Sequence, residues 1–324
     1  MKRLIGREKE IESLEAYVDS GQAEFIAIYG RRRVGKTFLI NQLFRNRLAF
    51  SLTGIIDGTP SEQMESYVQA LEFNGYKINE HPKNWLTAFA ELRKFLQPKI
   101  NSGEPCIVFI DEISCFDSQR SGFVRALGFF WNSWASLQDN LKLIICGSVT
   151  SWMITNIIDS KGGLHNRVTH EIALHQFTLH ETELYLLNRG FNWSRLTILQ
   201  AYMCLGGVPY YLSLLSASES LAENLDRLFF DRDAELQKEY SRLYKTLFKS
   251  PEPYMKIVKL LAESKQGLTR QEISTKLKIS GKALTDQLGN LQSCDIIRLY
   301  YVKESKIKKN GGIYQLMDFI SISI

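Results

Sequence analysis

The chain has 324 residues, of which 44% are apolar and 23% charged, a composition typical of folded domains that argues against long disordered stretches. This length allows two or three domains, each able to bury a core of its own. The formal net charge is +5, but residues 251–310 hold 12 Lys or Arg against 6 Asp or Glu, a local net of +6. Any contact with nucleic acid should therefore lie in that C-terminal third.

Two protein classes are excluded by simple patterns. The N-terminus is charged, and no uninterrupted apolar run approaches the roughly 18 residues of a membrane span, so we expect a cytoplasmic protein without a membrane partner. The cysteines are scattered and form no CxxC pair, which favours buried free thiols over a disulfide framework or a zinc site. They are Cys106, Cys115, Cys146, Cys204 and Cys294.

The first half of the chain alternates short apolar runs with amphipathic stretches. Ile11, Leu14 and Val18 recur at helical spacing, which predicts a helix over residues 7–18. Further helices are expected at residues 36–44 and 85–96, and buried strands at residues 25–29, 48–52, 106–110, 143–146 and 168–174. This alternation predicts an α/β sandwich around a mainly parallel sheet.

The second half is mostly helical in pattern. Residues 181–248 are interrupted only at Gly190 and at Gly206, Gly207 and Pro209, which predicts a small helical lid. Pro251 and Pro253 then mark a boundary, after which three short helices precede two strands, at residues 296–302 and 312–317. We therefore expect three domains, at residues 1–176, 177–250 and 251–324.

A phosphate-binding loop is predicted between the first apolar strand and the following helix. Glycine lets the backbone N–H groups turn toward phosphates, the helix N-terminus favours an anion, and Lys36 would reach the terminal phosphates of ATP. Thr37 is expected to bind Mg²⁺, and Phe38 closes the segment. The residues that match GxxxxGK[ST] are Gly30, Arg31, Arg32, Arg33, Val34, Gly35, Lys36 and Thr37.

Two other strand ends carry the polar residues that such a loop requires. The run at residues 107–110 leads directly into Asp111 and Glu112. Asp111 is expected to hold Mg²⁺ and Glu112 to polarise the attacking water, which points to hydrolysis rather than binding alone. Ser148 follows the strand at residues 143–146, a position suited to sensing the γ-phosphate.

The segments GRRRVGKT, VFIDEI, ICGSVTSWM, GGLHNR and GGVPYYL, in this order, resemble the archaeal-type ATPase family, an AAA-like group of P-loop proteins close to the STAND signalling ATPases. The resemblance covers about residues 4–302. It implies a five-stranded sheet in which the Walker B strand is not directly beside the Walker A strand, then a helical lid and a C-terminal winged helix. It also implies binding of ATP or ADP with Mg²⁺.

Several residues gain expected roles only through this resemblance. Gly6 and Arg7 match an N-terminal box whose backbone lies near the adenine, and Pro209 matches a lid proline that packs against the nucleotide. Arg167 matches an arginine that would stabilise charge on the γ-phosphate, in cis or from a neighbouring subunit; here Asn166 precedes it, where many relatives have glycine. Many relatives also continue into a nuclease-like domain. Residues 311–324 resemble only its lead-in, so no nuclease function is inferred.

The C-terminal module has helix-turn-helix spacing. Thr269 and Glu272 predict a capping box, and the helix expected at residues 282–292 would turn Leu284, Leu288 and Leu291 inward. Its outer side would present residue types that reach phosphates and base edges, namely Lys282, Thr285, Gln287 and Asn290. A face that contacts protein would look the same, so DNA and protein both remain possible partners.

The sequence therefore predicts an Mg²⁺-dependent ATP hydrolase or ATP-driven switch that acts through conformation or homo-oligomerisation. Two alternatives remain open. One is a nucleotide-regulated DNA-binding regulator, and the other is a scaffold that binds other proteins and does not hydrolyse ATP.

Overall fold

The computed structural model describes residues 4–118, 120–248, 250–264, 266–301 and 312–317. The chain forms two compact units. The N-terminal unit comprises Met1–Gly30 and Gly35–Leu174, and the C-terminal unit comprises Arg31–Val34 and His175–Ile324. The helices expected as a lid and the C-terminal module thus share one unit, which also includes the tip of the predicted phosphate-binding loop.

The N-terminal unit is built on a five-stranded parallel sheet. In space the strands follow the order β2-β3-β4-β1-β5, so β4 separates β3 from β1. This confirms that the strand ending in Asp111 is not adjacent to the strand that precedes Gly30. The strands are β1 (Glu24–Tyr29), β2 (Leu48–Thr53), β3 (Cys106–Asp111), β4 (Leu141–Gly147) and β5 (His170–Ala173).

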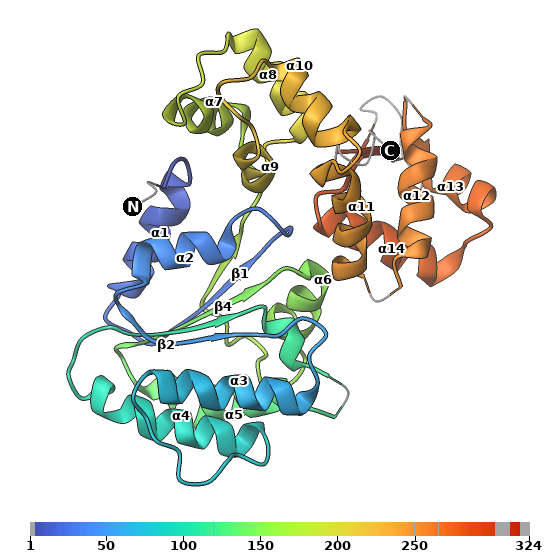
Figure 1. The fold of residues 1–324 in the computed structure, drawn as a ribbon. Coiled ribbons are helices and arrows are strands. Elements are labelled where there is room, and N and C mark those ends of the chain that lie inside the picture. Colours follow the sequence, from blue (N-terminus) through green and yellow to red (C-terminus); the bar gives the residue numbers. More distant parts are fainter. Residues whose placement is uncertain (1–3, 119, 249, 265, 302–311, 318–324) are drawn as a thin grey trace. The chain divides into compact units, whose positions relative to one another are not determined.

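Helices cover both faces of this sheet (Figure 1). On one face lie α1 (Glu8–Val18) and α2 (Lys36–Phe44); on the other lie α3 (Pro60–Phe73), α4 (Trp85–Ile100) and α5 (Phe123–Ser133). Side chains alternate along each strand, so Phe25 and Ala27 join the core beneath α3, α4 and α5, whereas Ile26 and Ile28 are buried outside that cluster. Short helical turns complete the unit: η1 (Ile113–Phe116), η2 (Ala135–Leu137), α6 (Thr150–Met153) and η3 (Ile154–Ile158).

Several predicted boundaries were wrong. The helix expected to end at residue 96 continues through Pro98 to Ile100, whose side chain packs into the core. The strand expected at 168–174 is shorter than predicted and spans His170–Ala173, the residues that pair with β1. The helices α3 and α5 were not specifically predicted. The cysteines form no disulfide, and burial raises the pKa of the Cys106 thiol to about 11.

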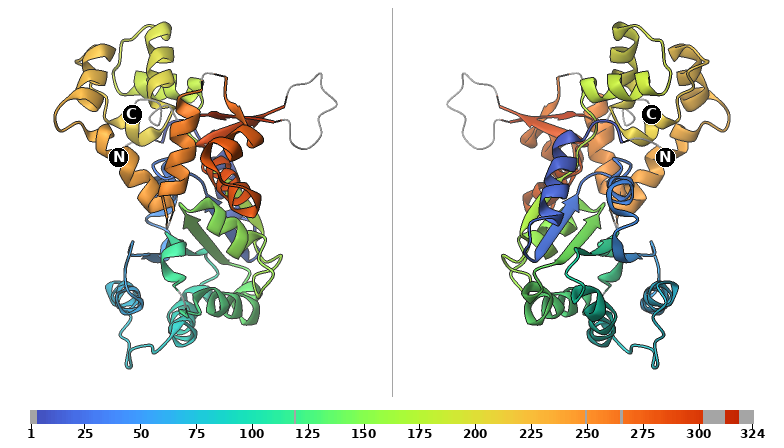
Figure 2. Two further views of the ribbon diagram at one scale, coloured as in Figure 1. Left: turned by 90° about the vertical axis from the view of Figure 1, so that its right-hand side faces the viewer. Right: turned by 90° about the vertical axis from the view of Figure 1, so that its left-hand side faces the viewer.

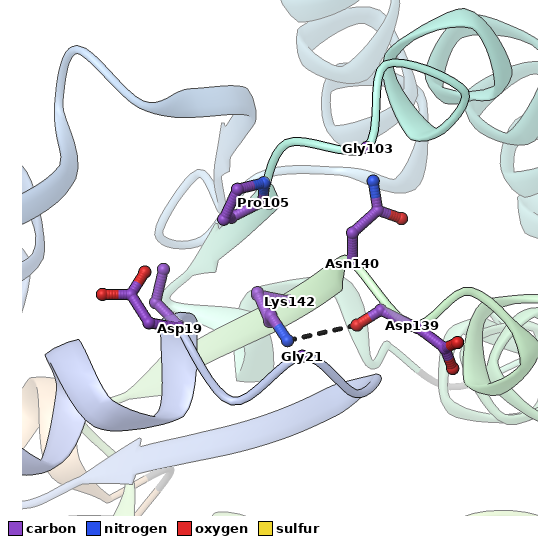
Figure 3. A pocket seen from close by; sticks show the side chains of 8 residues that line it. Asp19, Gly21, Gly103, Pro105, Asp139, Asn140 and Lys142 are labelled. Carbon is purple, nitrogen blue, oxygen red and sulfur yellow. Dashed lines mark hydrogen bonds between the residues drawn. The ribbon is translucent and has the colours of Figure 1, made fainter.

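A pocket of about 290 Å³ lies at the amino-terminal ends of β1, β3 and β4, the opposite edge from Asp111 (Figure 3). Lys142 lines it and is only 1% exposed. Its ammonium group donates to Ser20 Oγ and to the main-chain oxygen of Asp139, both at 3.2 Å, and to the main-chain oxygen of Gln22. The buried charge is thus satisfied by the chain itself, which makes this lysine a structural element.

The first part of the C-terminal unit is entirely helical. Its core gathers Phe177, Leu186, Tyr211 and Leu236, among others. The Gly206-Gly207 pair turns the chain after α8; a side chain at Gly207, where φ is +59°, would meet the main-chain oxygen of Phe177 at 2.2 Å. The elements are α7 (Leu179–Asn188), α8 (Arg195–Leu205), α9 (Pro209–Ser213), α10 (Leu221–Leu225), η4 (Asp226–Phe230) and α11 (Glu235–Leu247).

The second part of this unit has a core of its own, and α11 contributes to both cores, through Leu236 and Leu243. The predicted capping box of Thr269 and Glu272 is confirmed. A three-stranded antiparallel sheet of order β6-β8-β7 lies beside three helices, an arrangement compatible with a winged helix (Figure 2). The elements are α12 (Glu252–Ala262), β6 (Leu268–Thr269), α13 (Arg270–Leu277), α14 (Gly281–Ser293), β7 (Ile297–Tyr300) and β8 (Ile313–Leu316).

Some expectations fall on parts of the chain outside the description. The connection at residues 302–311 and most of the tail at residues 311–324 belong to this group. Across the described residues, no helix combines the length and apolar character needed to cross a bilayer.

Candidate functional site

Three of the predicted site positions meet at one edge of the parallel sheet. Gly30 follows β1, Asp111 ends β3, and Ser148 follows β4. Because β3, β4 and β1 are parallel and consecutive in the sheet, their carboxyl ends lie side by side. Ligands of open α/β sheets bind at this edge.

The loop after β1 holds two glycines in backbone conformations that favour glycine. Gly30 has φ +145° and Gly35 φ +95°, and a side chain at Gly30 would lie 2.1 Å from the main-chain oxygen of Leu174. Gly35 caps α2, and because glycine has no side chain, the cap supplies no acceptor of its own to the N–H groups of the first turn. Lys36 is buried, and its Nζ donates to the main-chain oxygen of Gly30 at 2.7 Å.

Thr37 and Asp111 form the first polar pair of the site. Thr37 Oγ1 donates to Asp111 Oδ2 at 2.7 Å, and the backbone N–H of Glu112 donates to Asp111 Oδ1 at 2.9 Å. Burial raises the pKa of Asp111 despite these hydrogen bonds, since the side chain is only 2% exposed. One hydroxyl and one carboxylate oxygen are the kind of protein ligands that Mg²⁺ takes beside phosphates, so this pair fits that ion.

Glu112 and Ser148 form the second pair. Ser148 Oγ donates to Glu112 Oε1 at 2.6 Å, and the backbone N–H of Ser148 makes a longer contact of 3.4 Å with Oε2. Glu112 adopts a left-handed conformation, φ +47° and ψ +46°, which costs free energy for a residue other than glycine. Such strain concentrates at functional sites. The sequence pattern suggested a role for each residue but did not predict that the two would be hydrogen-bonded.

Arg167 is in the same unit but is not bonded to these pairs. Its side chain is exposed, and its backbone N–H donates to the main-chain oxygen of Leu164 at 3.1 Å. Asn166 takes φ +52°, a left-handed conformation that asparagine adopts more readily than most residues. Across the described residues, no hydrogen bond or ion pair joins Arg167 to Glu112 or Ser148.

The other expected nucleotide-binding residues lie on separate elements. Gly6 and Arg7 have φ +68° and +70° just before α1, and Arg7 Nη1 lies 3.6 Å from Glu10 Oε1. Pro209 opens α9 in the C-terminal unit, while Phe38 in the first turn of α2 is 43% exposed.

The tip of the loop has partners that the sequence did not indicate. The guanidinium of Arg33 donates to both carboxylate oxygens of Glu239, Nε to Oε1 and Nη2 to Oε2, each at 2.9 Å. Its central carbon lies 3.8 Å from the ring centre of Tyr210. Glu239 is 206 positions away along the chain, so no local pattern could have indicated this pair.

Comparison with known proteins agrees with this geometry. A family model described as an ATPase domain predominantly from Archaea matches residues 4–215. An uncharacterized protein of Methanocaldococcus jannaschii is 26% identical over 318 residues, which cover 97% of this chain and 66% of that relative. An uncharacterized ATP-binding protein of the same archaeon is 44% identical over 43 residues, which cover 13% of this chain and 73% of that protein.

Two solved structures share the fold. A Walker-type ATPase of Pyrococcus abyssi has a TM-score of 0.68 at 19% identity, with 99% of this chain and 95% of that one covered. The ORC2 protein of Aeropyrum pernix, solved with ADPNP and ADP, has a TM-score of 0.59 at 15% identity, with 98% and 91% covered. The family model spans more than half of the chain. The central strands of the fold end at the loop that follows β1 and at the two polar pairs. The chain therefore belongs to the family of ATPase domains found predominantly in Archaea.

Proposed function

We propose that this protein binds ATP with Mg²⁺ and hydrolyses its terminal phosphoanhydride bond. The observation that carries the proposal is the meeting of two polar pairs, Thr37 with Asp111 and Glu112 with Ser148, at the strand edge where the phosphate-binding loop begins. One pair suits a metal ion, and the other supplies a fixed carboxylate for a water molecule.

Binding would use groups that already face the loop. The backbone N–H groups of residues 30–37 would receive the phosphates, and Lys36 would exchange its present bond to the main-chain oxygen of Gly30 for a phosphate oxygen. Thr37 and Asp111 would hold Mg²⁺, which when bound supplies positive charge against the charge of the phosphates. Burial raises the pKa of Asp111, and a bound cation would favour its charged form.

Hydrolysis would depend on how Glu112 is held. Its carboxylate would orient and polarise the attacking water, and Ser148 would fix that carboxylate through the 2.6 Å hydrogen bond. Ser148 would then act on the glutamate as well as sensing the γ-phosphate. The exposed position of Arg167 favours supply of its guanidinium from a neighbouring copy of the chain. Gly6, Arg7 and Pro209 remain proposed nucleotide contacts, on the strength of the family resemblance.

The direct test is release of inorganic phosphate from ATP by the purified protein. We expect turnover with Mg²⁺ that stops when the metal is chelated, and that is lost in Lys36→Ala together with most ATP affinity. Lys9→Ala, an exposed substitution on α1, is the matched control and should behave as wild type. Equal turnover by wild type and Lys36→Ala would contradict the proposal.

A second candidate function is DNA binding by the C-terminal module, which we propose is a winged helix. Lys282 and Thr285 on α14 are exposed, and this third of the sequence holds the chain's positive excess. The structure weakens one predicted contact, because the Asn290 amide donates to the hydroxyl of Tyr254 at 2.9 Å. Thr285 Oγ1 also accepts from Arg270 at 3.1 Å.

Size measurements separate this candidate from a scaffold that assembles with nucleotide. The protein is examined with ADP and with a slowly hydrolysed ATP analogue, each with and without duplex DNA. Binding to DNA that weakens with salt favours the regulator. Growth in size with the ATP analogue, without affinity for DNA, favours the scaffold that assembles with nucleotide.

A further inference from the structure

Arg33 occupies a backbone conformation that suits glycine rather than arginine. It lies at the tip of the phosphate-binding loop with φ +75°, between Gly30 and Gly35, whose φ values are also positive. A left-handed residue with a Cβ is strained relative to a right-handed one, so the conformation persists only where the surroundings enforce it. The loop therefore needs something that keeps Arg33 in place.

The side chain of Arg33 supplies that restraint. Two parallel hydrogen bonds of 2.9 Å join its guanidinium to Glu239, and the same group lies 3.8 Å from the ring centre of Tyr210. The backbone N–H of Tyr210 also donates to the main-chain oxygen of Arg33, at 3.4 Å. Bidentate charged pairs fix direction as well as distance, and contact with the ring removes the remaining freedom of the guanidinium plane.

Both partners are themselves firmly held. Glu239 is 4% exposed and sits on α11 between Leu236 and Leu243, which pack into two different cores of the C-terminal unit. The hydroxyl of Tyr210 is hydrogen-bonded to Glu235, which lies on α11 one turn before Glu239. The hydrogen bond to Glu239 raises the pKa of Arg33 although burial acts in the opposite direction. Arg33, Glu239 and Tyr210 together are called the clamp below, and the two partners of Arg33 in it are each held by further contacts.

We propose that Glu239 and Tyr210 are positioning residues that keep Arg33 in its left-handed conformation and so hold the loop ready for the phosphates of a nucleotide. The inference rests on the proposed nucleotide binding. A loop that visits this conformation only part of the time binds with an affinity reduced by that fraction. By reciprocity, a bound nucleotide must stabilise the pairing of Arg33 with Glu239.

Affinity for a fluorescent ADP analogue tests the clamp in the full-length protein. Glu239→Gln keeps the shape of the side chain but loses its charge, and we expect it to weaken binding by about 10-fold, within the range typical of coupled sites. Glu219→Gln is the matched control: this residue also pairs bidentately with an arginine, Arg227, in the same unit, and should leave affinity unchanged.

Substitution of Arg33 itself separates positioning from direct phosphate contact. Arg33→Gly loses the clamp but accepts a positive φ without strain, so it should bind the analogue more tightly than Arg33→Ala. Glu239→Gln should add less than a twofold effect in the Arg33→Gly background. Equal affinities of Arg33→Gly and Arg33→Ala would overturn the inference, because the side chain would then act by touching the phosphates.

A measurement without nucleotide distinguishes this inference from the proposed function. Hydrogen exchange of the backbone N–H groups at residues 31–36 should be faster in Glu239→Gln than in wild type or Glu219→Gln. Faster exchange in a protein that binds no nucleotide would refute the proposed function and leave the clamp standing. Unchanged exchange together with unchanged affinity in Glu239→Gln would refute the clamp.

Discussion

Replacement of Asp111 by asparagine should stabilise the ligand-free protein while it destroys the metal site. Asp111 is 2% exposed, and its Oδ1 and Oδ2 accept from the N–H of Glu112 and from Thr37 Oγ1. Asparagine has the same shape and keeps both contacts, because its oxygen accepts from the N–H of Glu112 and its amide donates to Thr37, whose hydroxyl serves either role. The substitution therefore removes a buried charge and keeps one hydrogen bond to each of the two partners.

The expected gain follows from the direction of the pKa shift. Burial raises the pKa of Asp111 above 3.8, so the folded state favours the neutral carboxyl. The stabilising contribution of the neutral Asp111 carboxyl is complete below pH 3.8 and is lost as pH rises through the pKa of the folded state. At neutral pH, Asp111→Asn should gain about 0.5–2 kcal/mol, because it removes a buried functional charge. Its advantage over wild type should shrink as the pH is lowered toward 3.8.

Thermal unfolding with and without Mg²⁺ and ATP measures both effects. A gain of 1 kcal/mol corresponds to roughly 2–4 °C for a domain of about 150–250 residues. Nucleotide at 100 times its Kd should add about 2.7 kcal/mol to wild type and much less to Asp111→Asn. The exposed Asp139→Asn is the control and should follow wild type. A ligand-free Asp111→Asn less stable than wild type, or stabilised equally by Mg²⁺ and ATP, would refute the reasoning.

Three further predictions concern individual side chains. Ser148→Ala should lower kcat by about 10²-fold with little change in KM, because the hydrogen bond that fixes Glu112 is lost; steady-state kinetics that show a raised kcat would contradict this. Arg167→Ala mixed with Glu112→Gln should regain turnover if the arginine acts from a neighbouring copy, and absence of complementation in mixed oligomers would argue against that. Lys282→Glu should weaken binding to all DNA sequences alike. The affinity of the wild type should fall as salt rises, with a slope of log affinity against log salt of about −0.9 per phosphate contacted. Fluorescence anisotropy that detects no binding at roughly 50 mM salt would remove DNA as a partner.

The parallel sheet could be predicted because its signals are local. Apolar runs such as residues 106–110 are continuous, since both faces of the sheet are covered, and each ends in a glycine or a polar residue. Element ends were less predictable. α4 continues past Pro98 to Ile100, which packs into the core. β5 is shorter than the apolar run in which it lies.

The site could be predicted residue by residue but not as a set of contacts. The positions of Lys36, Thr37 and Asp111 beside one another follow from spacing, because each lies at a set distance from the end of a strand. The bond between Ser148 and Glu112 depends on the order of strands in the sheet, and the bond between Arg33 and Glu239 depends on the packing of a distant helix. Contacts of that kind leave no periodic trace in a single sequence.

The most direct test of the account is a paired measurement on Glu112→Gln of ATP affinity and of the hydrolysis rate at saturating Mg²⁺ and ATP. The substitution leaves the loop, Thr37 and Asp111 in place but removes the carboxylate that would polarise water. We expect affinity close to that of wild type and a hydrolysis rate lower by orders of magnitude. Hydrolysis by Glu112→Gln at the wild-type rate would contradict the assignment of this site as the catalytic centre.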